Sequence, residues 1–265
     1  KAAERALAAA GVAPEELDII ILGTSSPDRN YPSDACSVQA AIGAVNAVAF
    51  DISAACAGFI FAMNIVEGFF KAGIYKTALI IGAETLSKVT DWSDRGTCVL
   101  FGDGAGAAVL KAEETGIIDM MMGADGTKGD VLACTSRTVG NFLTGTKPEL
   151  GFMTMDGQEV FKFAVRKVPE SVMELLQRTG TKKKDIKYYV LHQANERIIE
   201  AAARRLKEPM EKFPMTIGQF GNTSTASIPL LLNDMIQKDM LKRGDKIIMS
   251  GFGAGMTWGA VLMEW

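Results

Sequence analysis

The chain has 265 residues, of which 48% are apolar and 22% charged, and its net charge is −3. This composition is typical of a globular protein with a substantial core, and the weak negative charge argues against a general nucleic-acid binder. The longest uncharged run, residues 52–66, contains a glycine and is too short to span a membrane, and we see no signal-peptide pattern.

The first predicted element is a helix, because residues 1–10 have the pattern of the second half of a helix. Gly11 follows it, and glycine is common just after the last turn of a helix. A turn at residues 14–16 leads into a predicted strand, residues 17–22. We therefore expect the chain to begin within a helix.

A second strand-like run, residues 48–52, ends shortly before Cys56, and a helical pattern follows to about Ala72. This helix should be buried, because it is apolar on every side. A cysteine at the start of such a helix faces unpaired backbone N–H groups and the positive end of the helix dipole, and both favour the thiolate. We predict that Cys56 is a nucleophile with a lowered pKa; the alternative is a small buried apolar residue.

The other three cysteines, Cys36, Cys98 and Cys134, are far from Cys56 and from one another. Their spacing fits neither a zinc site nor a disulfide framework, and so large a chain rarely needs one. We interpret them as structural thiols and expect the protein to occupy the reducing cytoplasm.

An internal repeat relates the two ends of the chain. Residues 17–22 match residues 186–191, and residues 77–82 match residues 246–251, each pair 169 positions apart. Two glycine-rich stretches, which we predict to be hairpins, follow the second pair at residues 101–110 and 251–262.

The repeat predicts two similar α/β halves, residues 1–157 and 158–265, with an irregular insertion at about residues 111–157. The second half opens with a helix near Gln158, and the counterpart of that helix in the first half would start before residue 1. We therefore expect at least half of the counterpart helix, and whatever precedes it, to be absent.

The second half carries its own polar groups. His192 is the only histidine and follows a buried strand, at the kind of strand end where α/β proteins build sites, although a lone histidine is often structural. Asn222 lies in a Gly-Asn-Thr-Ser sequence that by itself indicates only a turn. The turn around Gly253 and Ala254 could bring backbone N–H groups to an oxyanion, or be only a tight hairpin.

Four motifs give the chain a resemblance to a known family: residues 54–59, 192–195, 221–227 and 251–259. The chain resembles β-ketoacyl-acyl-carrier-protein synthase III, the initiating condensing enzyme of type II fatty acid synthesis, over its whole length. The resemblance implies a thiolase-like, five-layer αβαβα fold built from two duplicated halves, with the family's usual N-terminal strand and part of the first helix absent. It also implies a homodimer with no nucleic-acid or membrane partner, and no metal or redox cofactor.

The family mechanism implies a role for each motif. Cys56 would take an acyl group from a short acyl-CoA, and the backbone N–H groups of Cys56 and of Gly253 or Ala254 would form the oxyanion hole. His192 and Asn222 would then bind the thioester carbonyl of malonyl-acyl-carrier protein and stabilise the enolate left by loss of CO₂.

The resemblance also implies surfaces for the two substrates. Arg95 and Asn195 would contact coenzyme A, and Tyr31 would reach across the dimer to close the acyl pocket of the partner. The predicted carrier-protein docking segment is Gln193, Ala194, Asn195, Glu196 and Arg197, with Arg204, Arg205 and Lys207 nearby on a basic helix that suits an acidic carrier protein.

Related activities are separated by their residue requirements. A degradative thiolase needs a second cysteine near residues 251–259, which contain none, and elongating condensing enzymes use two histidines. A polyketide-type condensing enzyme with the same Cys, His and Asn set stays open, as does an inactive acyl-binding paralogue. The primer, acetyl or branched, also stays open.

Overall fold

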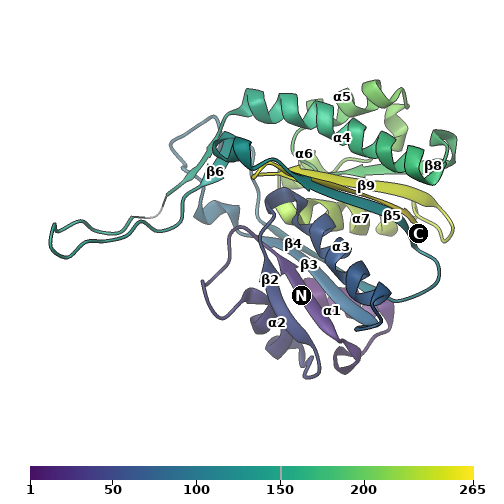
Figure 1. Ribbon diagram of the computed structural model, residues 1–265, viewed down its shortest axis with the longest axis horizontal. Helices are drawn as coiled ribbons and strands as arrows, with labels where there is room; N and C mark the ends of the chain where they lie inside the picture. Colours follow the sequence, from purple (N-terminus) through teal and green to yellow (C-terminus); the bar gives the residue numbers. More distant parts are fainter. Residues whose placement is uncertain (150) are drawn as a thin grey trace.

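The first sheet is built from the apolar runs of the first half. The computed structural model describes residues 1–149 and 151–265, and its first sheet has the strand order β2-β1-β3-β4 (Figure 1). β1 and β3 are almost entirely buried, as expected for parallel strands covered on both faces. The strands are β1 (Ile19–Gly23), β2 (Val48–Ile52), β3 (Thr77–Glu84) and β4 (Gly104–Lys111).

The second sheet has the order β5-β10-β9-β8. Its strands are β5 (Ile117–Ala124), β8 (Ile186–Leu191), β9 (Lys246–Gly253) and β10 (Thr257–Glu264). Strands β8, β9 and β10 repeat the pairing of β1, β3 and β4, whereas β5 is an additional strand antiparallel to β10. Two short strands, β6 (Leu132–Cys134) and β7 (Met153–Met155), pair at the base of an arm that leaves the body at the left of Figure 1. The predicted strands at residues 186–191 and 246–251 are confirmed.

Of the two predicted hairpins, only the second is present. β9 and β10 form an antiparallel pair joined by a tight turn, whereas residues 104–111 are the single strand β4, which pairs along its whole length with β3. Its glycines serve close packing instead of a turn: a Cβ atom on Gly106 would lie 2.8 Å from the side chain of Pro229. The chain instead returns from β3 through a long loop, residues 85–103.

Helices complete five layers (Figure 1). α1 (Ala2–Ala10) and α2 (Asp34–Ile42) pack on the outer face of the first sheet, and α4 (Gly157–Thr179) and α5 (Glu196–Leu206) on the outer face of the second. α3 (Gly58–Lys71) and α7 (Ser227–Gln237) lie between the sheets in one shared apolar cluster. A short helix, α6 (Ile217–Phe220), precedes α7. The predicted αβαβα fold is confirmed.

The repeat extends to the turns that precede the two central helices. The 3₁₀ turns η2 (Ala55–Ala57) and η7 (Ser224–Ala226) are 169 positions apart and start in the same left-handed backbone conformation, with φ 45° at Ala55 and 48° at Ser224. Such a conformation is uncommon outside glycine and is typical of functional sites. The two equivalent turns also contact each other, because Thr225 Oγ1 donates to Ala55 O at 2.8 Å.

The η7 turn is pressed into the first half. A Cβ atom on Gly82 would lie 2.4 Å from Thr225 O, and Cβ atoms on Gly23 and Gly58 would lie 2.7 and 3.0 Å from the Thr225 methyl carbon. Only glycine at these positions allows so close an approach.

The boundary between the halves differs from a division at residue 157. β5 lies within the insertion predicted at residues 111–157, yet it pairs with β10 in the second sheet. α1 ends at Ala10, and Gly11 follows it in the left-handed conformation (φ 62°), as the sequence indicates. Within residues 1–149 and 151–265, no helix is long and apolar enough to cross a membrane.

Candidate active site

The three predicted catalytic side chains line one cavity of about 230 Å³. Cys56 comes from the η2 turn, His192 from the residue after β8, and Asn222 from the segment before η7, so each follows a strand or precedes a central helix. The other lining residues come from both halves and from the short strands β6 and β7: Gly96, Leu100, Phe101, Leu132, Met155, Gly157, Val160, Phe161, Ala194, Asn195, Ile198, Phe252 and Gly253.

Cys56 is deeply buried, with 6% of its surface exposed. β9 comes so close that a Cβ atom on Gly253 would lie 2.6 Å from the Cys56 backbone nitrogen. Burial raises the pKa of the Cys56 thiol to about 12, the charge of Glu84 also raises it, and a hydrogen bond with Ser224 acts in the opposite direction. The predicted lowering of this pKa is wrong, because desolvation of the thiolate outweighs the helix start.

His192 is held in a defined orientation, and only 2% of its surface is exposed. Its Nδ1 lies 2.6 Å from Ser227 Oγ, and the backbone N–H of Gln193 donates to the same hydroxyl at 3.4 Å. The hydroxyl proton is therefore free for Nδ1, which leaves the ring proton on Nε2 as a donor. Burial lowers the pKa of His192 to about 3, so the imidazole is neutral at pH 7.

Asn222 is fixed by a clamp from the first half. Its backbone N–H donates to Leu100 O at 2.9 Å, and its carbonyl accepts from the Gly102 N–H at 2.9 Å. Its side-chain Oδ1 accepts from the Ser224 N–H at 2.8 Å, so the Asn222 NH₂ group is left to donate to a ligand. His192 and Asn222 thus offer two neutral N–H donors to the same cavity.

Comparison with known proteins gives the family. Residues 50–126 match 3-Oxoacyl-[acyl-carrier-protein (ACP)] synthase III, and residues 176–265 match the C-terminal part of the same family. Beta-ketoacyl-[acyl-carrier-protein] synthase III of Clostridium acetobutylicum is 50% identical over the whole chain, which covers 82% of that relative. The chain belongs to the 3-oxoacyl-[acyl-carrier-protein] synthase III family. It is therefore an acyl-transferring condensing enzyme.

Solved structures agree with this assignment. The synthase III structure from Aquifex aeolicus has a TM-score of 0.91 and 45% identity, with 99% of this chain and 82% of that chain covered. A priming β-ketosynthase from a polyketide biosynthetic pathway has a TM-score of 0.89 and 34% identity, with 99% and 79% covered. The fold and the family predicted from the sequence are both confirmed.

Gln193 is buried, whereas a residue that docks the carrier protein must be on the surface. It is 1% exposed, its Nε2 donates to Leu191 O at 2.8 Å, and its Oε1 accepts from the Thr216 N–H at 2.9 Å. Both ends of the amide are used inside the protein, so the prediction that Gln193 contacts the carrier protein is wrong. Its role is to hold the loop before α6 against the end of β8.

The rest of the predicted docking segment is accessible. Ala194 and Asn195 line the cavity, and Asn195 also caps α5 by accepting from the Arg197 N–H at 2.9 Å. Glu196 and Arg197 are exposed on the first turn of α5.

The remaining predicted residues lie at or beyond the cavity mouth. Arg95 is exposed next to Gly96, which lines the cavity. Ala254 follows Gly253, and its carbonyl oxygen accepts from the Thr257 hydroxyl at 3.0 Å. Tyr31 is 85% exposed in the loop before α2 and does not line the cavity of its own chain.

All four cysteines are free thiols. Cys36 and Cys98 are half-buried, but Cys134 is exposed at the end of β6, so the interpretation of Cys134 as a structural thiol is wrong.

The buried, neutral His192 gives the protein a pH-dependent stability. Between pH 6.5 and 3 the unfolded state binds a proton that the folded state excludes, so acidification favours unfolding. We expect wild type to lose about 2 kcal/mol more free energy of unfolding than His192→Gln between pH 7 and pH 5. Urea unfolding of both proteins at the two pH values measures the difference, and equal losses would contradict the burial effect.

Proposed function

We propose that this enzyme condenses a short acyl-CoA primer with malonyl-acyl-carrier protein, with loss of CO₂, to give the 3-oxoacyl-acyl-carrier protein that initiates fatty acid synthesis. The observation that carries the proposal is the meeting of Cys56, His192 and Asn222 at one cavity. The name of the Clostridium relative supports an acyl-carrier-protein substrate. The mechanism invokes no metal or redox cofactor.

In the first half-reaction Cys56 sulfur attacks the thioester carbonyl of the acyl-CoA. A carbon–sulfur bond forms at Cys56, the bond to coenzyme A breaks, and coenzyme A leaves. The backbone N–H of Cys56, with one from Gly253 or Ala254, stabilises the oxyanion. A Cβ atom placed on Gly253 would lie only 2.6 Å from the Cys56 backbone nitrogen. The backbone of β9 is therefore close to that of Cys56, which supports an oxyanion hole made by both.

In the second half-reaction the malonyl thioester oxygen accepts hydrogen bonds from His192 Nε2 and the Asn222 amide. Loss of CO₂ leaves an enolate, and both donors stabilise the charge on its oxygen. A neutral histidine suits this task, because it donates a hydrogen bond without giving up its proton. The enolate then attacks the acyl carbon on Cys56 and releases the product and the Cys56 thiolate.

The direct test supplies acetyl-CoA and malonyl-acyl-carrier protein to the purified chain and measures 3-oxoacyl-carrier protein and CO₂. The similarity to a priming β-ketosynthase favours a second candidate, a polyketide starter condensation with the same three residues. A panel of straight, branched and aromatic acyl-CoA primers separates the two. An inactive acyl-binding paralogue would give no product with any primer.

The exposed end of α5 is the proposed docking site for the carrier protein, with Arg95 and Asn195 contacting coenzyme A at the cavity mouth. Arg204 forms an ion pair with Glu200, and Arg205 donates a hydrogen bond to Val165 O. Both guanidinium groups therefore already have partners within the chain. Among the residues that the structure describes, Arg197 has no ion pair, and it lies next to the cavity residue Asn195. Arg197 is therefore the docking residue expected to matter most.

Reversing the charge of Arg197 tests the docking surface. Arg197→Glu should raise KM for malonyl-acyl-carrier protein several-fold, most strongly at low salt, and leave acylation by acetyl-CoA unchanged. Arg243→Glu is the matched control, because Arg243 is exposed before the amino end of β9, whereas the cavity is at the other end. Equal loss in both half-reactions would argue against carrier-protein docking.

The proposal includes a cytoplasmic homodimer in which Tyr31 reaches the acyl pocket of the partner subunit. Tyr31 is 85% exposed, so its side chain is accessible to a partner subunit, which is compatible with such a contact. Sedimentation of wild type and Tyr31→Ala tests the oligomeric state, and acylation rates with long and short primers test the pocket.

A further inference from the structure

Ser227 lies beside the imidazole of His192 in the interior of the protein. It is the first residue of α7, only 2% of its surface is exposed, and its Oγ is 2.6 Å from His192 Nδ1. The Gln193 N–H donates to the same oxygen at 3.4 Å. Within residues 1–149 and 151–265, the Ser227 hydroxyl makes no other hydrogen bond.

The proton of this hydroxyl has one acceptor. The Gln193 N–H is a donor, so His192 Nδ1 is the atom that can accept the hydroxyl proton. The pKa of His192 is lowered to about 3, so the ring carries a single proton at pH 7. If that proton were on Nδ1, two donors would point at Ser227 Oγ and the buried hydroxyl proton would have no acceptor, which costs free energy.

Other contacts fix the backbone and the ring plane of His192. Its N–H donates to Ser250 O at 2.8 Å, and its ring packs edge-on against Phe252 with the ring centroids 5.4 Å apart. Neither contact distinguishes the two ring nitrogens, whereas Ser227 binds only Nδ1. Nε2 has no hydrogen-bond partner among the described residues, and His192 lines the cavity of Cys56.

The segment that carries Ser227 also sets the orientation of the second donor. Ser224, three residues earlier, donates its backbone N–H to Asn222 Oδ1 at 2.8 Å. The oxygen of the Asn222 amide is therefore occupied and its NH₂ group is left for a ligand. Residues 222–227 thus determine which end of each polar group is presented as a donor.

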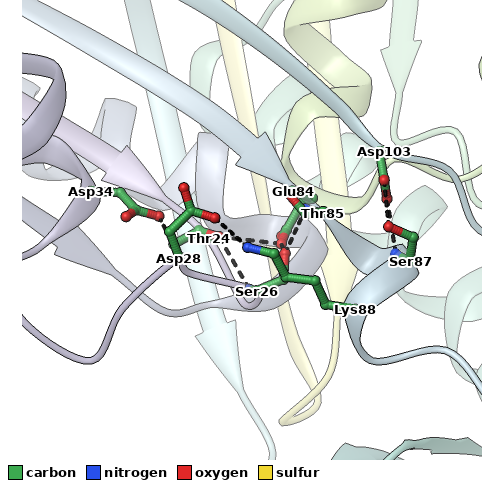
Figure 2. A network of polar contacts seen from close by, with 9 residues as sticks. All are labelled: Thr24, Ser26, Asp28, Asp34, Glu84, Thr85, Ser87, Lys88 and Asp103. Atoms are coloured by element: carbon green, nitrogen blue, oxygen red, sulfur yellow. Dashed lines mark hydrogen bonds and ion pairs between the residues drawn. The ribbon is translucent and has the colours of Figure 1, made fainter. Parts of the chain in front are cut away.

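Glu84 anchors this segment to the first half of the protein. It is 5% exposed at the end of β3, and its Oε1 accepts from Ser224 Oγ at 2.9 Å and from Thr225 Oγ1 at 2.8 Å. Figure 2 shows Glu84 among hydroxyl groups from the loop after β1. From this loop its Oε2 accepts three hydrogen bonds: Ser25 N at 3.0 Å, Ser26 Oγ at 2.6 Å and Thr24 Oγ1 at 3.3 Å.

We propose that Ser227 is a positioning residue that holds the ring proton of His192 on Nε2, where it is donated to the malonyl thioester oxygen. Ser227 does not line the cavity and acts only through His192. With the proton on Nδ1, the Nε2 lone pair would face the enolate oxygen and repel it. This role deepens the proposed function and rests on it.

Nitrogen NMR tests the position of the proton directly. His192 is the only histidine, so protein labelled with ¹⁵N-histidine and made without a histidine tag gives one pair of ring-nitrogen signals. In wild type at pH 7, Nε2 should have the chemical shift of an N–H nitrogen and Nδ1 that of an unprotonated one. In Ser227→Ala the two shifts should approach each other, because both nitrogens then share the proton.

Release of CO₂ from malonyl-acyl-carrier protein is the second readout. Ser227→Ala should release CO₂ about tenfold more slowly, a smaller loss than complete removal of a donor causes. Acylation of Cys56 by acetyl-CoA should be unchanged. Ser250→Ala is the matched control, because it removes another buried hydroxyl near His192, one that donates to Gly259 O at 3.1 Å and not to the ring. This control should keep the wild-type spectrum and rate.

A double variant separates positioning from a general structural effect. His192→Ala combined with Ser227→Ala should be no slower than His192→Ala alone, because Ser227 acts through the missing ring. Losses that add would overturn the proposal, as would a wild-type proton on Nδ1 or a proton that stays on Nε2 alone in Ser227→Ala. The wild-type spectrum decides the position of the proton even where Ser227→Ala fails to fold. If wild type releases no CO₂, the proposed function fails, while the spectra still report whether Ser227 holds the proton on Nε2.

Discussion

Replacing Cys56 with serine should reduce acylation by acetyl-CoA by several orders of magnitude. The serine hydroxyl is the poorer nucleophile, and no other group in the cavity can form the acyl intermediate. Incubation with radiolabelled acetyl-CoA, followed by peptide mapping, should place the label on the peptide that contains Cys56 in wild type and on no peptide in the variant.

The control for this experiment is the second half-reaction. His192 and Asn222 are unchanged in Cys56→Ser, so the variant should still decarboxylate malonyl-acyl-carrier protein. Label on the exposed Cys134, or label that persists in the variant, would contradict the role of Cys56.

Replacing His192 or Asn222 with alanine should have the opposite pattern. Each variant loses one hydrogen-bond donor to the enolate oxygen, which typically costs about 10²–10³ in rate. Acylation of Cys56 should stay close to wild type, because neither side chain takes the thiol proton. Separate assays of acetyl transfer and of CO₂ release from malonyl-acyl-carrier protein measure the two effects.

The double variant provides a sharper test. Both donors serve one oxygen, so the combined loss should be smaller than the product of the two single losses. A different result would change the mechanism: if His192→Ala abolished acylation and spared decarboxylation, His192 would be the base for the thiol.

The fold was predictable because its strands are continuous apolar runs that recur at a constant spacing. β3 and β9 are buried on both faces, so their sequences are almost purely apolar and the repeat is visible without a structure. The meeting of Cys56 and His192 followed from the same logic, because each comes after the end of a strand and strand ends converge in α/β proteins.

Other features depend on contacts between distant parts of the chain. The raised pKa of Cys56 results from burial by segments such as β9, whose Gly253 lies against it, and no local pattern reports that burial. Gln193 is polar and flanks the exposed part of its motif, but its partner Thr216 is 23 residues away. Neither property can be read from the neighbouring residues.

Glu84 was not among the residues singled out from the sequence. It ends a buried strand, so the rule that singled out His192 applies to it equally. What the rule cannot supply is the set of partners, because Ser224 and Thr225 lie 140 and 141 residues further along the chain. The apolar cavity walls Leu132, Met155 and Phe161 were missed for a different reason: they belong to or follow an insertion without periodicity.

The seating of the η7 turn among Gly23, Gly58 and Gly82 has a consequence for the order of events in catalysis. Contacts this close pack the two halves tightly against each other, so we expect the cavity between them, about 230 Å³, to keep its size through both half-reactions. A cavity of this size favours binding of the acyl donor and the malonyl donor one after the other. In the proposed reaction, coenzyme A leaves before malonyl-acyl-carrier protein binds. The acyl group that stays covalently bound to Cys56 connects the two half-reactions.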